Sequence, residues 1–168
     1  MVSDVTIRPA VEADLEAIHE IYNGYIRDTP ITFDIDPIPM ERRREWFTHY
    51  QTHGRHRLWV AVRDGACIGY ATSSPFRPKA AYDTSVETTI YLAPGAGGGG
   101  IGSQLYGALF ESLDGEDVHR AYAGITLPND ASVAIHRRFG FEQVGLYREV
   151  GRKFERYWDV GWFEKKLD

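Results

Sequence analysis

Apolar residues recur at helical spacing in four parts of the chain. In the first, an acidic turn at Glu12 and Asp14 precedes an apolar face, which is typical of a helix N-terminus. The second predicted helix runs from residue 40 to about residue 52, and two more cover residues 101–113 and 129–139. The residues that mark the buried faces of the first two helices are Leu15, Ile18, Ile21, Tyr22, Tyr25, Trp46, Phe47 and Tyr50.

Seven strands are predicted between and after these helices. Asp64 and Gly65 separate apolar runs at residues 57–63 and 66–73, and this arrangement is a strong signal for a β-hairpin. The proline-containing stretch 29–39 predicts a loop. The other strands are expected at residues 5–8, 82–92, 118–126, 141–150 and 154–165. Since no linker or repeat interrupts this order, we expect one mixed α/β domain over residues 1–168.

Composition narrows the class of protein. Of the 168 residues, 43% are hydrophobic, which suits one ordinary core, and the net charge of −5 argues against a nucleic-acid partner. No apolar run reaches the ~18 residues of a membrane span, and the N-terminus lacks the basic and apolar regions of a signal peptide. Cys67 is the only cysteine, which fits a reducing compartment. We therefore expect a soluble, cytoplasmic protein.

A dense run of glycines lies between a predicted strand and a predicted helix. Residues 93–103 read APGAGGGGIGS. Because glycines carry no side chains, several backbone N–H groups can point at one anion, and the helix N-terminus adds a partial positive charge. The run therefore predicts a pyrophosphate site, with a flexible linker as the plainer alternative.

Two familiar phosphate loops fit this run less well. A Walker loop needs a Lys directly before Ser103, where this chain has Gly102. The dinucleotide pattern GxGxxG is met by Gly95, Gly97 and Gly100, but a run of glycines meets almost any glycine motif. That pattern also belongs to repeated strand–helix–strand units, and only one such unit is predicted here.

Glu87 is a charged residue in the middle of the predicted strand 82–92. Alternate residues of a strand face opposite sides, so Glu87 shares a face with Ser85, Thr89 and Tyr91. Burial of a carboxylate without a partner is costly, and partial burial raises the pKa and makes the group a better base near neutral pH. The alternative is a Glu that faces solvent or pairs with Arg.

Five stretches of the sequence form a recognisable set. They read ITF at 31–33, AYDTSVETTIYLAP at 81–94, GGIGSQLY at 99–106, LPNDASVAIHRRFGF at 127–141 and YWDVGWFEKKL at 157–167. Together they resemble the GNAT superfamily of N-acetyltransferases, and within it the phosphinothricin or methionine sulfoximine/sulfone acetyltransferase branch. The resemblance covers nearly the whole chain, and the second and fourth stretches together are specific to that branch.

The resemblance implies a GNAT fold, in which a mostly antiparallel seven-stranded sheet has a splayed pair of strands and about four flanking helices. Acetyl-CoA would lie in the cleft that the splay opens. Backbone groups of Ile90, Tyr91 and Leu92 would pair with the pantetheine and the acetyl carbonyl. Asn129 matches a cofactor contact, although it also fits a plain helix N-cap. The residues expected to bind the pyrophosphate are Gly97, Gly98, Gly99, Gly100, Ile101, Gly102 and Ser103.

The resemblance also assigns two catalytic roles. Glu87 matches the proposed general base, which takes a proton from the substrate ammonium. His136 falls where many members have a Tyr that protonates the departing thiolate, and a histidine can take either proton-transfer role near neutral pH. The alternative for His136 is a purely structural hydrogen bond. The implied mechanism is direct attack in a ternary complex, with no covalent enzyme intermediate.

The glycine run departs from the superfamily pattern at one position. The usual loop reads Gln/Arg-x-x-Gly-x-Gly, and Gly97 occupies the Gln/Arg position. Backbone groups alone would then hold the phosphates. Since a charge-assisted hydrogen bond contributes about 1.5–3 kcal/mol, we expect weaker cofactor affinity.

The substrate side is less well defined by the sequence. An amino-acid substrate brings a carboxylate, for which Arg77 and Lys79 are the candidate partners, although Arg77 also fits an ordinary surface residue. Phe33 and Phe76 could wall the side-chain pocket. Members of this branch pair as homodimers, which the aromatic C-terminal strands would suit, and the resemblance calls for no metal.

Other functions stay open at this point. The same fold could acetylate a peptide N-terminus or a polyamine, and Asp34, Asp36 and Asp83 could supply acidic walls for the latter. A non-catalytic acyl-CoA sensor is a second alternative, which the altered loop favours and the presence of both Glu87 and His136 opposes. A dinucleotide-binding module is the third.

Overall fold

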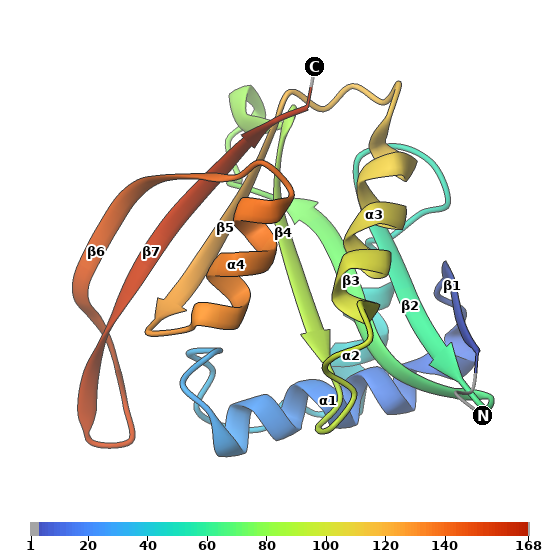
Figure 1. Cartoon of the computed structure of the whole chain (residues 1–168), viewed down its shortest axis with the longest axis horizontal. Helices are drawn as coiled ribbons and strands as arrows, with labels where there is room; N and C mark the ends of the chain where they lie inside the picture. Colours follow the sequence, from blue (N-terminus) through green and yellow to red (C-terminus); the bar gives the residue numbers. More distant parts are fainter. Residues whose placement is uncertain (1–3, 168) are drawn as a thin grey trace.

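Seven strands form one mixed sheet, which confirms the predicted fold class (Figure 1). The computed structural model describes residues 4–167, and the strand order is β1-β2-β3-β4-β5-β7-β6. Neighbouring strands are antiparallel except for β4 and β5, which are joined through a helix. The strands are β1 (Val5–Pro9), β2 (Arg57–Arg63), β3 (Ala66–Pro75), β4 (Ser85–Leu92), β5 (Arg120–Leu127), β6 (Glu142–Lys153) and β7 (Arg156–Lys166).

Helices cover both faces of the sheet because its central strands carry apolar residues on both sides. They are α1 (Leu15–Asp28), α2 (Met40–Phe47), α3 (Ile101–Leu113) and α4 (Asp130–Arg138). In β2, Val60 packs against Ile18 of α1, whereas the next residue, Ala61, packs in the cluster that includes Leu105 of α3. Within residues 4–167, no helix has the length and apolar character needed to cross a bilayer.

The sheet is interrupted between its two parallel strands. β4 and β5 pair only at Ser85–Arg120, Val86–Ala121 and Glu87–Tyr122. Beyond Glu87, β4 continues along β3 and β5 continues along β7, so the two strands separate. This is the splay that the family resemblance implied, and Glu87 is the last paired residue before it.

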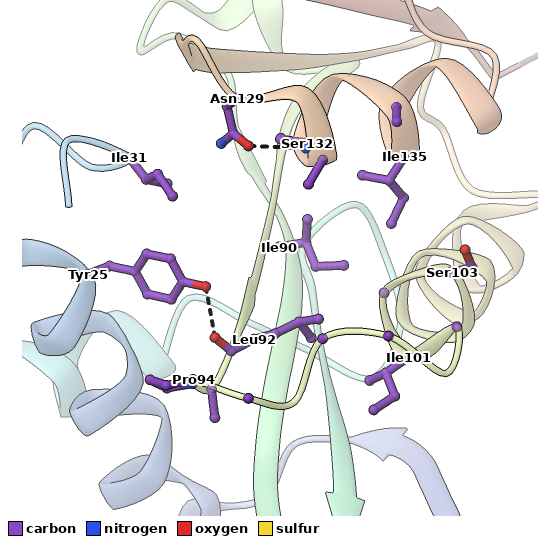
Figure 2. Close-up of a pocket in the computed structure, with 18 of the residues that line it drawn as sticks. Tyr25, Ile31, Ile90, Leu92, Pro94, Ile101, Ser103, Asn129, Ser132 and Ile135 are labelled. Atoms are coloured by element: carbon purple, nitrogen blue, oxygen red, sulfur yellow. Dashed lines mark hydrogen bonds between the residues drawn. The ribbon is translucent and has the colours of Figure 1, made fainter. Parts of the chain in front are cut away.

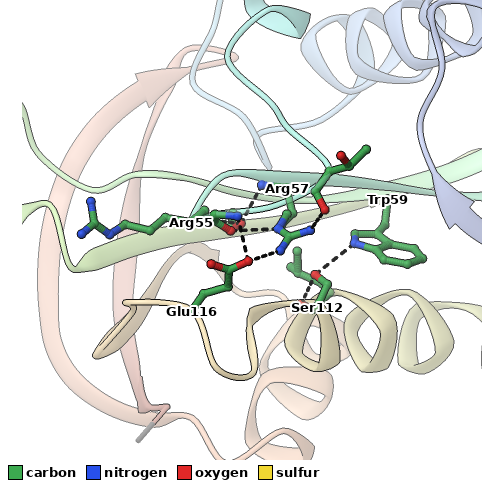
Figure 3. A network of polar contacts seen from close by, with 9 residues as sticks. Arg55, Arg57, Trp59, Ser112 and Glu116 are labelled. Atoms are coloured by element: carbon green, nitrogen blue, oxygen red, sulfur yellow. Dashed lines mark hydrogen bonds and ion pairs between the residues drawn. The ribbon is translucent and has the colours of Figure 1, made fainter.

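A polar network fixes α3 against the start of β2 (Figure 3). Arg57 is 8% exposed, pairs with Glu116 and donates to two backbone carbonyl groups. Trp59 Nε1 donates to Ser112 Oγ at 3.1 Å. Because Ser112 and Glu116 lie at and just beyond the end of α3, these contacts anchor that end of the helix. They thereby set the position of its other end, which carries the glycine run.

The sequence predictions were wrong at several element boundaries. The strand predicted from residue 118 begins at Arg120, and the last hairpin turns at residues 154–155, which were predicted as strand. Two further boundaries have a clear physical cause. The strand predicted from residue 82 begins at Ser85, because Ala80–Tyr82 forms a 3-10 turn in which Tyr82 N–H donates to the Lys79 carbonyl at 2.9 Å. The second helix ends at Phe47, since the next backbone N–H groups bond three residues back and tighten the chain into a turn. The predicted buried side of that helix is confirmed by Trp46, which packs against the core cluster that includes Ile18 and Ile21 of α1.

Candidate functional site

A cavity of about 780 Å³ opens between the end of β4, the glycine run and α4 (Figure 2). Tyr25 of α1 and Ile31 of the loop after it close one side. Of the predicted cofactor residues, only Tyr91 and Gly99 do not line it. The structure thus brings the strand end, the loop and the start of α4 together around one cavity. The predicted residues that line the cavity are Ile90, Leu92, Gly97, Gly98, Gly100, Ile101, Gly102, Ser103 and Asn129.

The backbone of the glycine run explains why glycine is needed there. Gly98, Gly99 and Gly100 have φ angles of 85°, 61° and 76°, in the left-handed region that other residues avoid. Gly100 is the N-cap of α3, so the N–H groups of the first helical turn lack intrahelical partners. The loop therefore presents backbone donors and a helix N-terminus to the cavity, which suits an anion.

Gly102 lies at a close contact between two helices. A Cβ atom at this position would lie 2.9 Å from Ile135 Cδ1 of α4, so the end of the Ile135 side chain would have to shift. The glycine thus lets α3 and α4 approach each other across the floor of the cavity. Gly97 differs from both cases, because its φ is not in the left-handed region and nothing lies within 4 Å of an added Cβ.

Arg138 and Tyr25 are among the cavity residues that the sequence analysis did not predict. Arg138 lines the mouth, and its Nη1 donates to Ser103 Oγ at 3.3 Å. Its helical spacing from Ile135 could have placed it on the cavity face of α4. Tyr25 donates from its hydroxyl to the Leu92 carbonyl at 2.8 Å and so fixes the end of β4 (Figure 2). No sequence pattern links two residues so far apart in the chain.

A narrower cavity of about 50 Å³ lies in the splay itself. Its walls are residues 88–91 of β4 and residues 123–126 of β5. Asn129 lines both cavities, and its Oδ1 accepts the Ser132 N–H at 3.2 Å, so it is an N-cap whose side chain also faces the cleft. The two interpretations of Asn129 in the sequence are therefore compatible.

Glu87 is half-buried at the point where the splay begins. Burial raises the pKa of Glu87 above its ordinary value of 4.5, and the positive charge of Arg77 partly opposes that shift. The Phe76 ring stacks on Tyr122 with 4.3 Å between centroids, and the Arg77 guanidinium lies 4.2 Å from the Phe76 ring. Three predicted residues, Phe76, Arg77 and Glu87, thus belong to one cluster.

Phe33 and Lys79 lie apart from that cluster. Phe33 packs against β6, where its ring would be 2.1 Å from a Cβ added at Gly151. Lys79 is exposed ahead of the 3-10 turn. None of the five predicted residues Phe33, Phe76, Arg77, Lys79 and Glu87 is among the lining residues of the two cavities described above. Over residues 4–167, no three His, Cys, Asp or Glu side chains are grouped as metal ligands.

His136 is 3% exposed and reaches the small cavity from α4. Its Nδ1 lies 2.7 Å from the Ser132 carbonyl, which can only accept, so Nδ1 carries a proton. Its Nε2 lies 2.8 Å from the Tyr106 hydroxyl, which therefore donates to the neutral ring. Burial lowers the pKa of His136 below its ordinary 6.5. Both ring nitrogens are engaged, so any proton exchanged at Nε2 passes through Tyr106.

The cleft opens where two parallel strands separate, next to a glycine-rich loop at the start of a helix. Comparisons with known proteins identify the class of protein that has this geometry. The model of the acetyltransferase (GNAT) family matches residues 16–141. The chain therefore belongs to the acetyltransferase (GNAT) family and is an N-acetyltransferase.

Named relatives agree with the branch that the motifs indicated. The chain is 58% identical to a phosphinothricin N-acetyltransferase of Streptomyces coelicolor, over 98% of both chains. It is 34% identical to an L-methionine sulfoximine/L-methionine sulfone acetyltransferase of Pseudomonas aeruginosa, over 97% of this chain and 95% of that protein. A phosphinothricin acetyltransferase from Sinorhizobium meliloti, solved with acetyl-CoA, superposes with a TM-score of 0.91 at 35% identity, over 97% of this chain and 88% of that one.

The environment of His136 predicts a pH-dependent stability. The unfolded chain protonates this residue near pH 6.5, whereas the folded protein keeps it neutral to lower pH. Stability should therefore fall as pH decreases below 6.5, by up to about 1.4 kcal/mol per pH unit until the folded pKa is reached. Denaturant unfolding at pH 7.5 and 5.5 should show a smaller loss in His136→Asn than in wild type. Equal losses in the two proteins would contradict this environment.

Proposed function

We propose that this enzyme transfers an acetyl group from acetyl-CoA to the amino group of a small amino-acid-like substrate of the phosphinothricin, methionine sulfoximine or methionine sulfone type. The observation that carries the proposal is the position of Glu87, a carboxylate with a raised pKa at the start of the splay. The relatives named above support the substrate class, because their names specify these three compounds.

The cavity fits acetyl-CoA in size and in chemistry. A volume of about 780 Å³ suits a large cofactor, the loop and the α3 N-terminus suit its phosphates, and Arg138 adds a positive charge at the mouth. The unpaired edge of β4 at Ile90 to Leu92 offers backbone groups to an amide-containing chain. When bound, the cofactor supplies an acetyl group activated as a thioester.

The protein's own residues then carry the proton transfers. Glu87, ionised above its pKa, accepts the proton that the substrate ammonium must lose before its nitrogen can attack. His136 holds its proton on Nδ1, and its Nε2 accepts a hydrogen bond from the Tyr106 hydroxyl. These two buried side chains beside the splay are the candidates to supply a proton to the departing thiolate. No side chain needs to form a covalent intermediate, and the reaction is a direct transfer in a ternary complex.

Release of free thiol from acetyl-CoA across a panel of amines tests the function. Phosphinothricin, methionine sulfoximine and methionine sulfone should be acetylated, whereas a peptide and a polyamine should not. Glu87→Gln should lower kcat by about 100-fold or more, because general-base catalysis contributes about 10²–10⁴. If thiol is released only with the peptide or only with the polyamine, that compound class is the substrate instead. If no amine releases thiol, the protein is better described as an acyl-CoA sensor.

Arg77 should control the pH dependence of the reaction. The base must be ionised, so kcat/KM should rise with pH through the pKa of Glu87. Since the charge of Arg77 lowers that pKa, Arg77→Met should raise it and move the acid limb to higher pH. The measurement is kcat/KM from pH 5 to 9. Lys79→Met is the matched control, and the acid limb of its pH profile should stay at the wild-type pH. If the acid limb of Arg77→Met also stays at the wild-type pH, Glu87 is not the titrating base.

The altered glycine run should limit cofactor affinity. Gly97 has room for a side chain and an ordinary φ, so Gly97→Arg can supply the missing phosphate contact and should tighten acetyl-CoA binding by about 10-fold or more. Gly100→Ala should weaken binding, because φ at this position is 76°. Isothermal titration measures both, with Gly97→Ala as the neutral control. Unchanged affinity in Gly97→Arg would show that backbone groups alone suffice.

We further propose a homodimer that uses the hairpin of β6 and β7, which extends away from the rest of the sheet (Figure 1). Large hydrophobic side chains are exposed along it, and such a patch is typical of an interface. Tyr157→Glu should shift the protein to monomer in sedimentation experiments, whereas Val11→Glu, exposed on another surface, should not. A monomeric wild type would refute this proposal. The exposed residues are Val144, Leu146, Tyr147, Val150, Phe154 and Tyr157.

A further inference from the structure

A third cavity, of about 280 Å³, lies on the face of the sheet covered by α1 and α2. Its floor is formed by alternate residues of two paired strands, Tyr70, Thr72 and Ser74 of β3 and Thr89 and Tyr91 of β4. Its walls come from α1, α2 and the segments that follow them. The wall residues are Tyr22, Asp34, Ile38, Arg42, Arg43, Trp46 and Tyr50.

Arg43 is the unusual member of this lining. Its side chain belongs to a residue that is only 3% exposed, yet Nε and Nη2 have no hydrogen-bond partner within residues 4–167. The guanidinium lies 4.3 Å from the Trp46 ring and 4.9 Å from the Tyr22 ring, so aromatic faces hold it in place. A buried cation without an anion is costly to the fold, which points to a partner that binds from outside.

Several other polar groups of the cavity are already paired, and Arg42, the other cation of the lining, is exposed. Tyr22 donates to Asp34 Oδ2 at 2.6 Å, at an exposed position on the rim. The hydroxyl groups of Tyr50 and Ser74 are 2.7 Å apart. No carboxylate of the described chain lies within ion-pair distance of Arg43. The Arg43 guanidinium keeps two buried donors free, and its planar fork matches a carboxylate in a two-point geometry.

The cavity adjoins the catalytic carboxylate. Ser74 in its floor is the cross-strand partner of Glu87, and Thr89 and Tyr91 share the Glu87 face of β4. Thr89 and Tyr91 also line the small cavity in the splay. A ligand that extends from Glu87 along this face therefore reaches Arg43 without crossing the sheet.

We infer that Arg43 binds the carboxylate of the amino-acid substrate, with the substrate amine directed toward Glu87. This inference rests on the proposed function and names the residue that would select amino acids over plain amines. The carboxylate replaces the anion that the buried guanidinium lacks. Arg77 keeps its separate place on the Phe76 and Trp162 rings, beside Glu87.

The test compares two substrates that differ only in the carboxylate, methionine sulfone and 3-(methylsulfonyl)propan-1-amine. Wild type should prefer the amino acid in kcat/KM by about 10- to 100-fold, the usual range for hydrogen bonds between charged groups. Arg43→Met should remove that preference by raising KM for methionine sulfone, while the rate with the plain amine stays within about two-fold. Arg44→Met, on the exposed side of the same helix, should keep the preference.

Two further measurements separate binding from folding. Acetyl-CoA affinity should be unchanged in Arg43→Met, and its denaturation midpoint should not fall, because the removed charge has no anionic partner and Met can keep the contacts with the two rings. Arg43→Lys keeps the charge without the planar fork and should restore only part of the preference. A preference retained in Arg43→Met would overturn the inference.

The wild-type protein alone can also refute the idea. If it acetylates both compounds with equal kcat/KM, the site does not recognise the substrate carboxylate and the inference fails. The acetyltransferase function is unaffected by that result. If it acetylates neither compound nor any other amino acid, the proposed substrate class itself fails. The two results are distinguished by turnover with the plain amine.

Discussion

The whole site depends on one break in backbone pairing, where β4 and β5 part after Glu87. Parallel strands normally pair along their length, and unpaired backbone groups inside a protein need another partner. Here the free edge of β4 faces a cavity that continues to the glycine run. The same break leaves Glu87 half-buried beside the opening, so one structural feature supplies both a free backbone edge and the shift in the pKa of Glu87.

Electrostatics in this protein are local. With a net charge of −5, the protein as a whole does not attract an anionic cofactor, so attraction must come from the helix N-terminus, the loop amides and Arg138. On the other face of the sheet, Arg43 is held between aromatic rings with free donors. The two positive sites lie on opposite sides of β4, which suits a reaction between two ligands that meet at the splay.

Much of this architecture could be predicted because it follows from local patterns. The two-residue period placed Glu87 in β4, the Asp64-Gly65 pair placed the β2–β3 hairpin, and the glycine run placed the start of α3. Two of the boundaries that failed, at residue 82 and after Phe47, depend on short turns that compete with strand and helix hydrogen bonds.

The contacts that the sequence could not supply are those between distant segments. Tyr106 and His136 are on different helices, so their hydrogen bond, which fixes the state of the imidazole, has no signature in either segment. Phe33 packs on Gly151, over 100 residues away in the chain, and neither segment indicates this contact. Arg43 looks like any charged residue in the run ERRRE until the packing of α2 buries it.

A crystal structure of the protein with acetyl-CoA tests the central claim most directly. The account predicts phosphates at the N–H groups of Gly98 to Gly102, pantetheine along the free edge of β4, and the thioester in the splay on the side reached from Glu87. Phosphates bound elsewhere, or a Glu87 carboxylate directed away from the thioester, would contradict it.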